Sequence, residues 1–182
     1  MGETEARIAI GFGVGKLHDK VRTAEEMLEA LYDEYAPALF RYALALLSSA
    51  DDAEDAVQEV FIRVARECKR IGKIGNIKAY LFTATRNAAY SILRGRQRRN
   101  EVTDDELPEL ATESADDTFM AIRECLARLP VEQREVIVLK VFDGMTFEEI
   151  ARTVGESPNT IASRYRYGIE KLRRALEEDR NG

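Results

Sequence analysis

Apolar residues recur at intervals of three and four along most of this 182-residue chain, and this spacing limits its fold more than any other feature. Residues 49–68 show it clearly, with an apolar stripe formed by Val57, Val60, Phe61, Val64 and Cys68. The run REVIVLKVF at 134–142 is rich in β-branched residues and would suit a buried strand by propensity. Helical patterns on both sides of this run favour a helix there too, so the sequence predicts an all-α fold.

The helical patterns fall into two parts. Between them, EVTDDELPELATESADD at 101–117 has few large apolar side chains and many acids, which is typical of a flexible linker. We therefore predict two small helical domains, at 23–100 and 118–182, after an N-terminal tail at 1–22 that need not be ordered. The first domain should begin with two helices, because Pro37 suits the first turn of a second one.

The net charge of −6 hides an uneven distribution of charge. Residues 61–100 carry 11 basic and 1 acidic side chain, whereas residues 1–60 carry 5 basic and 13 acidic ones. The segment RNAAYSILRGRQRRN at 86–100 alone has five arginines and no acid. A basic block between acidic segments is typical of nucleic-acid binding, but solvated helix faces carry arginine as well. Charge alone leaves both interpretations open.

The segment TFEEIARTVGESPNTIASRYRY at 146–167 has the turn chemistry of a helix-turn-helix. Thr146 and Glu149 form a capping box, Gly155 can end the first helix, and Ser157 with Pro158 can start the second. The second helix of this motif enters the major groove of DNA. Its outward side, which we name the recognition face, would carry the DNA contacts Asn159, Thr160, Ser163, Arg164, Arg166, Tyr167 and Lys171. The alternative is an ordinary solvated surface helix.

A second candidate surface lies on the helix predicted over 76–95. This helix is apolar on more than one side, which predicts a central position in the fold. Its core face would consist of Ile77, Leu81, Ala84, Ala88 and Ile92. About a third of a turn away is a set that we name the outward stripe: Tyr80, Thr83, Asn87, Tyr90 and Arg94. A basic tail of Arg96, Arg98 and Arg99 follows.

Rings that stack on unpaired bases, an amide for a base edge and arginines for phosphates are what binding of a single strand requires. The alternative is that the two tyrosines of the stripe are half-buried packing residues and that the arginines are merely solvated.

Several classes of function are disfavoured. His18 is the only histidine, which rules against histidine-based triads and multi-histidine metal sites. Cys68 and Cys125 lie far apart without a CxxC partner, so buried free thiols are expected. The glycines of GFGVGK at 11–16 are one residue too close for a phosphate loop, and Leu17 replaces its Ser or Thr.

The acids Asp51, Asp52, Glu54 and Asp55 could hold a metal, but acids at a helix start also suit its dipole. We expect no enzyme, no catalytic residue, no cofactor and no metal. The acidic N-terminal segment and the lack of an apolar run of about 18 residues predict a cytoplasmic protein without membrane insertion.

Three segments, in this order, carry a resemblance over about residues 25–178: DAEDAVQEVFIRV, NIKAYLFTATRNAA and LPVEQREVIVLKVFDGMTFEEIARTVGESPNTIASR. They resemble the extracytoplasmic-function (ECF) group of bacterial sigma factors, in the sigma-70 family. The resemblance implies a subunit that binds core RNA polymerase and directs promoter-specific initiation. It implies that the first domain binds the β′ clamp helices and reads the −10 element as melted single strand. The second domain would read the −35 element and touch the β flap.

The resemblance also assigns residues and a further partner. The polymerase-binding positions, which we name the clamp face, would be Asp55, Gln58, Glu59, Ile62, Arg63 and Arg66. Asn87 resembles the residue that holds a flipped −10 base. An anti-sigma factor is implied as a partner.

The chain departs from the family pattern at four positions. Tyr80 stands where the family usually has Trp, and Ser91 stands where Asp is common. In the second domain, Gly168 and Glu170 interrupt a run that is usually basic.

One alternative remains at this point: a regulator that touches DNA only through the helix-turn-helix, with a first domain that senses or dimerises. The outward stripe and basic tail argue against it, because a sensor domain has no need of them. For the sigma factor we expect the free chain to bind DNA weakly and with a steep dependence on salt.

Overall fold

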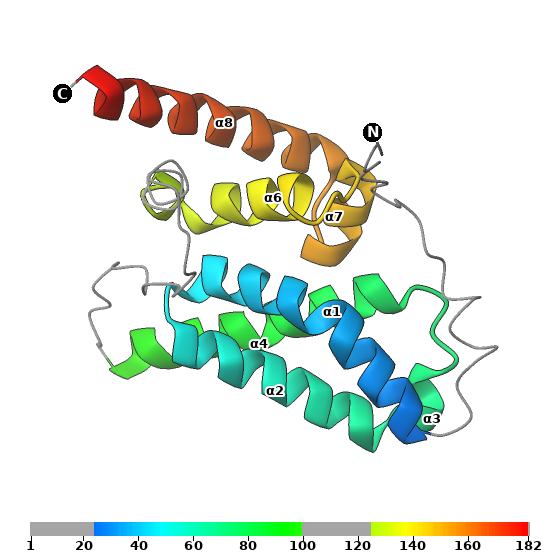
Figure 1. The fold of residues 1–182 in the computed structure, drawn as a ribbon. Coiled ribbons are helices and arrows are strands. Elements are labelled where there is room, and N and C mark those ends of the chain that lie inside the picture. Colours follow the sequence, from blue (N-terminus) through cyan, green and yellow to red (C-terminus); the bar gives the residue numbers. More distant parts are fainter. Residues whose placement is uncertain (1–23, 100–124, 182) are drawn as a thin grey trace, which may run out of the picture.

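The computed structural model describes residues 24–99 and 125–181. In these ranges every regular element is a helix, which confirms the all-α prediction (Figure 1). The helices are α1 (Ala24–Leu47), α2 (Ala50–Arg66), α3 (Cys68–Ile71), α4 (Ile77–Arg99), α6 (Val131–Val141), α7 (Phe147–Val154) and α8 (Pro158–Asn181). The predicted tail at 1–22 and the linker at 101–117 lie outside the described residues. None of the described helices is long and apolar enough to cross a membrane.

α1 is one helix, so the prediction of two helices in this segment was wrong. Pro37 lies inside it with an exposed ring. A proline removes one backbone N–H from a helix interior, but on the exposed side water can bond the carbonyl that loses its partner. Leu31 and Leu39, on either side of Pro37, are both buried. Packing of this continuous apolar face outweighs the local cost of the proline.

α2 forms as its apolar stripe predicts. Val57, Val60, Phe61 and Val64 are all buried, while the side chain of Cys68 is outside the described set. The helix begins where the Ser49 hydroxyl accepts a hydrogen bond from the Asp52 N–H at 3.3 Å. The acids that follow Ser49 lie in the first turn, where the helix dipole favours negative charge.

The helix-turn-helix has the predicted turn chemistry. The Thr146 hydroxyl accepts from the Glu149 N–H at 3.2 Å, and the Glu149 carboxylate accepts from the Thr146 N–H at 2.8 Å. Gly155 ends α7 with φ of 79°, a left-handed conformation that favours glycine. The Ser157 hydroxyl then caps α8 by accepting from the Thr160 N–H at 3.1 Å.

The two halves of the described chain pack directly on each other. In Figure 1, α6 and α7 lie between α8 above and the group α1, α2 and α4 below. One continuous apolar cluster includes Leu39, Tyr42 and Phe82 from the first half and Leu139 and Ile150 from the second. We name this packing of α6 and α7 against α1 and α4 the closed arrangement.

Candidate nucleic-acid interface

α4 is buried on more than one side, as predicted. Ile77, Leu81, Ala84 and Ala88 are buried and Ile92 is half-buried, which confirms the predicted core face. Phe82, Thr85 and Ala89 are also fully buried. Burial of both sets leaves only a narrow part of this helix in contact with solvent.

The outward stripe occupies that remaining part of α4. Asn87 and Arg94 are exposed, whereas Tyr80, Thr83 and Tyr90 are half-buried. Tyr80 and Tyr90 both pack against the margin of the apolar core. The stripe therefore presents a free amide between two rings whose positions are fixed by packing, which suits stacking with unpaired bases.

Arg86 was not among the predicted site residues, yet it lies against the stripe. Its guanidinium carbon is 4.4 Å from the centre of the Tyr90 ring. Burial and the negative charge of Glu135 raise the pKa of Tyr90. The clue in the sequence was the position of Arg86, one helical turn before Tyr90 and inside the basic block.

The basic tail is only partly free. Arg96 forms an ion pair with Asp52 and donates to the Leu47 carbonyl oxygen at 3.2 Å, so it ties the end of α4 to the corner between α1 and α2. Arg98 is exposed. The side chain of Arg99 lies outside the described set.

The clamp face is a continuous outer side of α2. All six of its residues are exposed, and the side chains of Glu59 and Arg63 form an ion pair at 2.8 Å. Ile62 is 51% exposed. Tyr32 on the neighbouring α1, which the sequence analysis missed, is also exposed, and its ring meets the Phe61 ring at 4.9 Å.

The recognition face lies on the N-terminal half of α8. Asn159, Arg166, Tyr167 and Lys171 are exposed, and Thr160, Ser163 and Arg164 are partly exposed. Arg164 forms an ion pair with Glu156 at 2.9 Å, and the Arg166 guanidinium lies 5.1 Å from the centre of the Tyr167 ring. These contacts hold two basic groups in place at the surface.

Two departures from the family pattern have a structural basis. A Cβ atom on Gly168 would lie 2.8 Å from Ile137 Cδ1 and 3.3 Å from Gln133 Cβ, so glycine permits α8 to cross α6 closely. Glu170 forms an ion pair with Arg174 one turn further along. Within the described residues, no group of three or more His, Cys, Asp or Glu side chains could hold a metal ion.

Comparison with known proteins decides the family. Residues 31–99 match the family Sigma-70 region 2, and residues 119–172 match Sigma-70, region 4. The chain is 35% identical over 159 residues to the ECF RNA polymerase sigma factor SigL of Mycobacterium tuberculosis, covering 84% of this chain and 90% of SigL. The chain belongs to the ECF sigma factors.

Other ECF and sigma relatives agree with this assignment. The RNA polymerase sigma factor SigV of Bacillus subtilis is 26% identical to this sigma factor, with 88% of this chain and 97% of SigV covered. Among solved structures, the sigma factor RpoE of Bartonella quintana, in complex with the anti-sigma factor NepR, is 28% identical. That match has a TM-score of 0.75 and covers 84% of this chain and 98% of RpoE.

As a sigma factor, the chain directs promoter-specific transcription initiation. The alternative of a regulator with a single DNA-binding site is disfavoured, because the family matches include the first half of the chain as well as the helix-turn-helix.

Proposed function

We propose that the outward stripe of α4 reads the −10 element as melted single strand. The observation that carries this proposal is the exposed amide of Asn87 between the fixed rings of Tyr80 and Tyr90. Asn87 would hold a base that has left the stack, and the rings would stack on its neighbours. Thr83 and Arg94 would contact the strand beside them, with Arg96, Arg98 and Arg99 following along the phosphates.

The recognition face of α8 would read the −35 element in the major groove. Amide and hydroxyl groups at its N-terminal end suit base edges, while its arginines and Lys171 suit base edges and phosphates. Asn159, at the start of α8, is exposed and would enter the groove first.

The division of labour follows the two halves. Residues 23–100 would bind core polymerase and the −10 element, residues 118–182 would bind the −35 element and the β flap, and residues 101–117 would connect them. The clamp face on α2 would meet the β′ clamp helices, with Ile62 as an apolar contact among charges. Such a protein acts in the cytoplasm, where polymerase and promoters are.

An anti-sigma factor is a further proposed partner. Support comes from the similarity to RpoE of Bartonella quintana, which was solved in complex with the anti-sigma factor NepR.

Run-off transcription with purified core polymerase tests the proposed function. A promoter selected from random DNA by the reconstituted holoenzyme serves as template. We expect transcripts only when both the chain and core polymerase are present. No initiation that depends on core polymerase, on any selected template, would contradict the proposal.

A further inference from the structure

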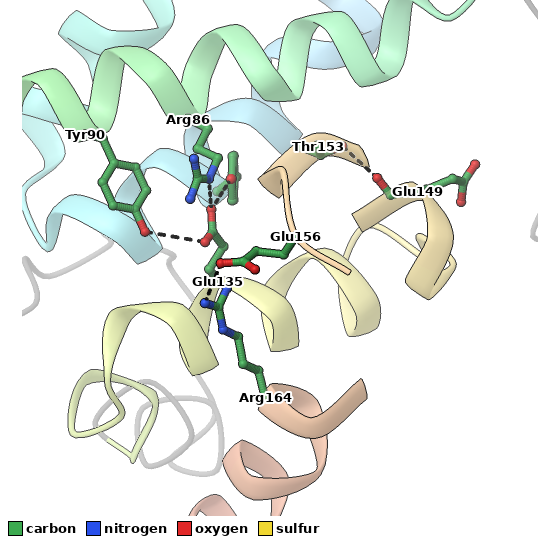
Figure 2. A network of polar contacts seen from close by, with 8 residues as sticks. Arg86, Tyr90, Glu135, Glu149, Thr153, Glu156 and Arg164 are labelled. Atoms are coloured by element: carbon green, nitrogen blue, oxygen red, sulfur yellow. Dashed lines mark hydrogen bonds and ion pairs between the residues drawn. The ribbon is translucent and has the colours of Figure 1, made fainter. Parts of the chain in front are cut away.

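A buried carboxylate joins the two halves of this sigma factor. Glu135 of α6 is 0% exposed, and its Oε1 accepts hydrogen bonds from the Tyr42 hydroxyl at 2.7 Å and from Arg86 Nε at 2.8 Å. Its Oε2 lies 3.5 Å from the Tyr90 hydroxyl. Figure 2 shows Arg86 and Tyr90 reaching from α4 toward Glu135. We name these four residues the Glu135 cluster.

All three donors to Glu135 come from the other half of the chain. A buried carboxylate is stable only when it is paired and hydrogen-bonded, so the environment that Glu135 needs exists only in the closed arrangement. Burial would by itself lower the pKa of Arg86, but Glu135, Tyr42 and Tyr90 outweigh it and raise that pKa. The guanidinium and the carboxylate therefore stabilise each other across the contact between halves.

Other polar contacts between the halves surround this cluster. Arg134 Nη1 donates to the Ser48 hydroxyl at 3.0 Å, and Lys78 Nζ donates to the Asp143 carbonyl oxygen at 2.8 Å. The Asp143 carboxylate lies 3.6 Å from Arg41 Nη2. The closed arrangement is thus specified by directional bonds as well as by apolar packing.

The closed arrangement is too small to read both promoter elements at once. The −10 and −35 elements lie about 25 base pairs apart, which is roughly 85 Å of duplex at about 3.4 Å per base pair. A compact chain of 182 residues has a radius of gyration of about 16 Å and hence a diameter of roughly 40 Å. Residues 100–124 connect the halves, and a chain of that length can extend to roughly 80–90 Å. The halves can therefore separate far enough, and promoter binding requires that they do.

We propose that the Glu135 cluster is an intramolecular latch, which holds the sigma factor closed and occupies two groups that bind DNA after opening. This inference rests on the proposed function of α4. The Glu135 carboxylate stands where a phosphate of the −10 strand would stand, because Arg86 and Tyr90 offer the same donors to either anion. Arg86 is accordingly a further DNA-binding residue of the open chain.

A latch also gives a reason for weak DNA binding by the free chain. When only the open fraction is competent, the apparent dissociation constant rises by the inverse of that fraction. Core polymerase and promoter together bind only the open chain, so their binding would shift the equilibrium from the closed arrangement to the open chain.

Replacement of Glu135 by glutamine tests the latch, since it removes the charge and keeps the shape. Fluorescent labels on non-natural residues at positions 54 and 177, both exposed, report the distance between α2 and α8 and leave the native cysteines in place. In a urea titration of the wild-type chain, this distance should lengthen before helix content falls. For Glu135→Gln the open-to-closed ratio should rise by roughly ten- to a hundredfold, as for loss of a charge-assisted hydrogen bond, so the distance should lengthen at lower urea concentration.

The matched control is Glu132→Gln, which removes the same charge from an exposed position on the same helix. Glu132 acts on Tyr90 through its charge alone, so this variant should shift the distance curve far less than Glu135→Gln. An unshifted curve for Glu135→Gln, an equal shift for Glu132→Gln, or a distance that lengthens only as helix content is lost would each overturn the latch. Should Glu135→Gln lose helix content without urea, Arg86→Gln takes its place and must produce the shift with its helices intact.

A second arm separates the latch from the proposed function. In run-off transcription, Glu135→Gln should reach half-maximal initiation at roughly tenfold lower sigma concentration, because less of it is closed. Half-maximal initiation at an unchanged concentration would overturn the latch. Failure of the wild-type chain to initiate at all would instead overturn the proposed function, while the distance measurement would still decide whether the latch exists.

Discussion

Gly168 determines how closely α8 can approach α6. A Cβ at this position would lie 2.8 Å from Ile137 Cδ1, and Ile137 is itself almost fully buried. Glycine destabilises a helix by about 1 kcal/mol relative to alanine. At Gly168 this loss is offset, because the absence of a side chain lets α8 pack closely against α6. The recognition face depends on this contact, since it lies on the same helix.

We predict that Gly168→Ala lowers the free energy of unfolding by about 1 kcal/mol. Overpacking costs roughly 1–3 kcal/mol and the gain in helix propensity offsets part of it. Ile137→Val removes the atom that the new methyl group meets, so the double variant should lose less than the two single variants together. Urea unfolding of all four chains measures this coupling, and strict additivity would contradict the close contact.

Gly168 also illustrates what the sequence could not reveal. In the sequence, Gly168 stood out only as a departure from the family's basic run, and this departure had no explanation. Its role depends on Ile137, which is 31 positions away in the chain, and no local pattern records that two helices cross there. The sequence did place Arg86 inside the basic block, one turn before Tyr90, but its pairing with Glu135 of the other half could not be predicted from any local pattern.

At the scale of elements, the turn between α7 and α8 depends on one left-handed residue. Gly155 has φ of 79° with nothing within 4 Å of a Cβ, so the cost of a side chain there is backbone strain alone. Gly95, within α4, has no positive φ and also has open space around a Cβ. The two glycines are therefore a matched pair for substitution: both have space for a side chain, and only Gly155 has a left-handed backbone.

We predict opposite effects of alanine at the two positions. Gly155→Ala should destabilise the chain by about 1–2 kcal/mol, because L-residues resist the left-handed region. Gly95→Ala should stabilise it by up to about 1 kcal/mol through helix propensity. Thermal or urea unfolding measures both, and a stabilising Gly155→Ala would show that the turn does not have the described geometry.

Elements differ in how well their ends could be predicted. The capping box at Thr146 and the glycine stop at Gly155 were predicted correctly, because side chain and backbone interact there within a few residues. The break at Pro37 was wrong, because burial of Leu31 and Leu39 against other helices overrides the local preference of proline. Local chemistry sets the turn, whereas tertiary packing sets the length of α1.

At the scale of the whole molecule, closure should depend on pH through Asp143. Its side chain is 3% exposed and lies between the halves, facing Arg41 of α1, while Lys78 of α4 bonds its carbonyl oxygen. Burial raises the pKa of Asp143 from 3.8 to about 6, although Arg41 and Lys78 oppose the shift. The closed arrangement therefore binds a proton more tightly than a chain in which Asp143 is solvated.

The sign of the pH effect follows from this raised pKa. The stabilisation is fully present below the ordinary pKa of 3.8 and is lost as the pH rises through about 6. Between pH 7 and pH 5 the closed arrangement should gain about 1 kcal/mol. Asp143→Asn should remove this part of the pH dependence, which the labelled chain in urea can measure at both pH values. Identical pH dependence in the wild-type chain and in Asp143→Asn would contradict the assignment of this pH effect to Asp143.

The whole-molecule arrangement was the least predictable part of the structure. Two helical halves separated by an acidic segment suggested independent domains. The β-branched run of α6 raised only the choice between strand and helix, and the second apolar side of α4 indicated only a central helix. In the structure, Phe82 of α4 and Leu139 of α6 belong to one apolar cluster. The sequence could not predict this contact, because it depends on how the two halves are placed relative to each other. Promoter binding would in turn require that this position change.

Promoter opening by the Asn87→Ala holoenzyme tests most directly whether the outward stripe grips melted DNA. Fluorescent bases in the −10 element report unpairing, and Gln97→Ala, an exposed amide on the same helix outside the stripe, is the control. We predict that the Asn87→Ala variant binds core polymerase normally but that its promoter opening falls by at least roughly tenfold, as expected for about 1–3 kcal/mol lost at one base. The Gln97→Ala variant should open the promoter normally. Normal opening by Asn87→Ala would contradict the account.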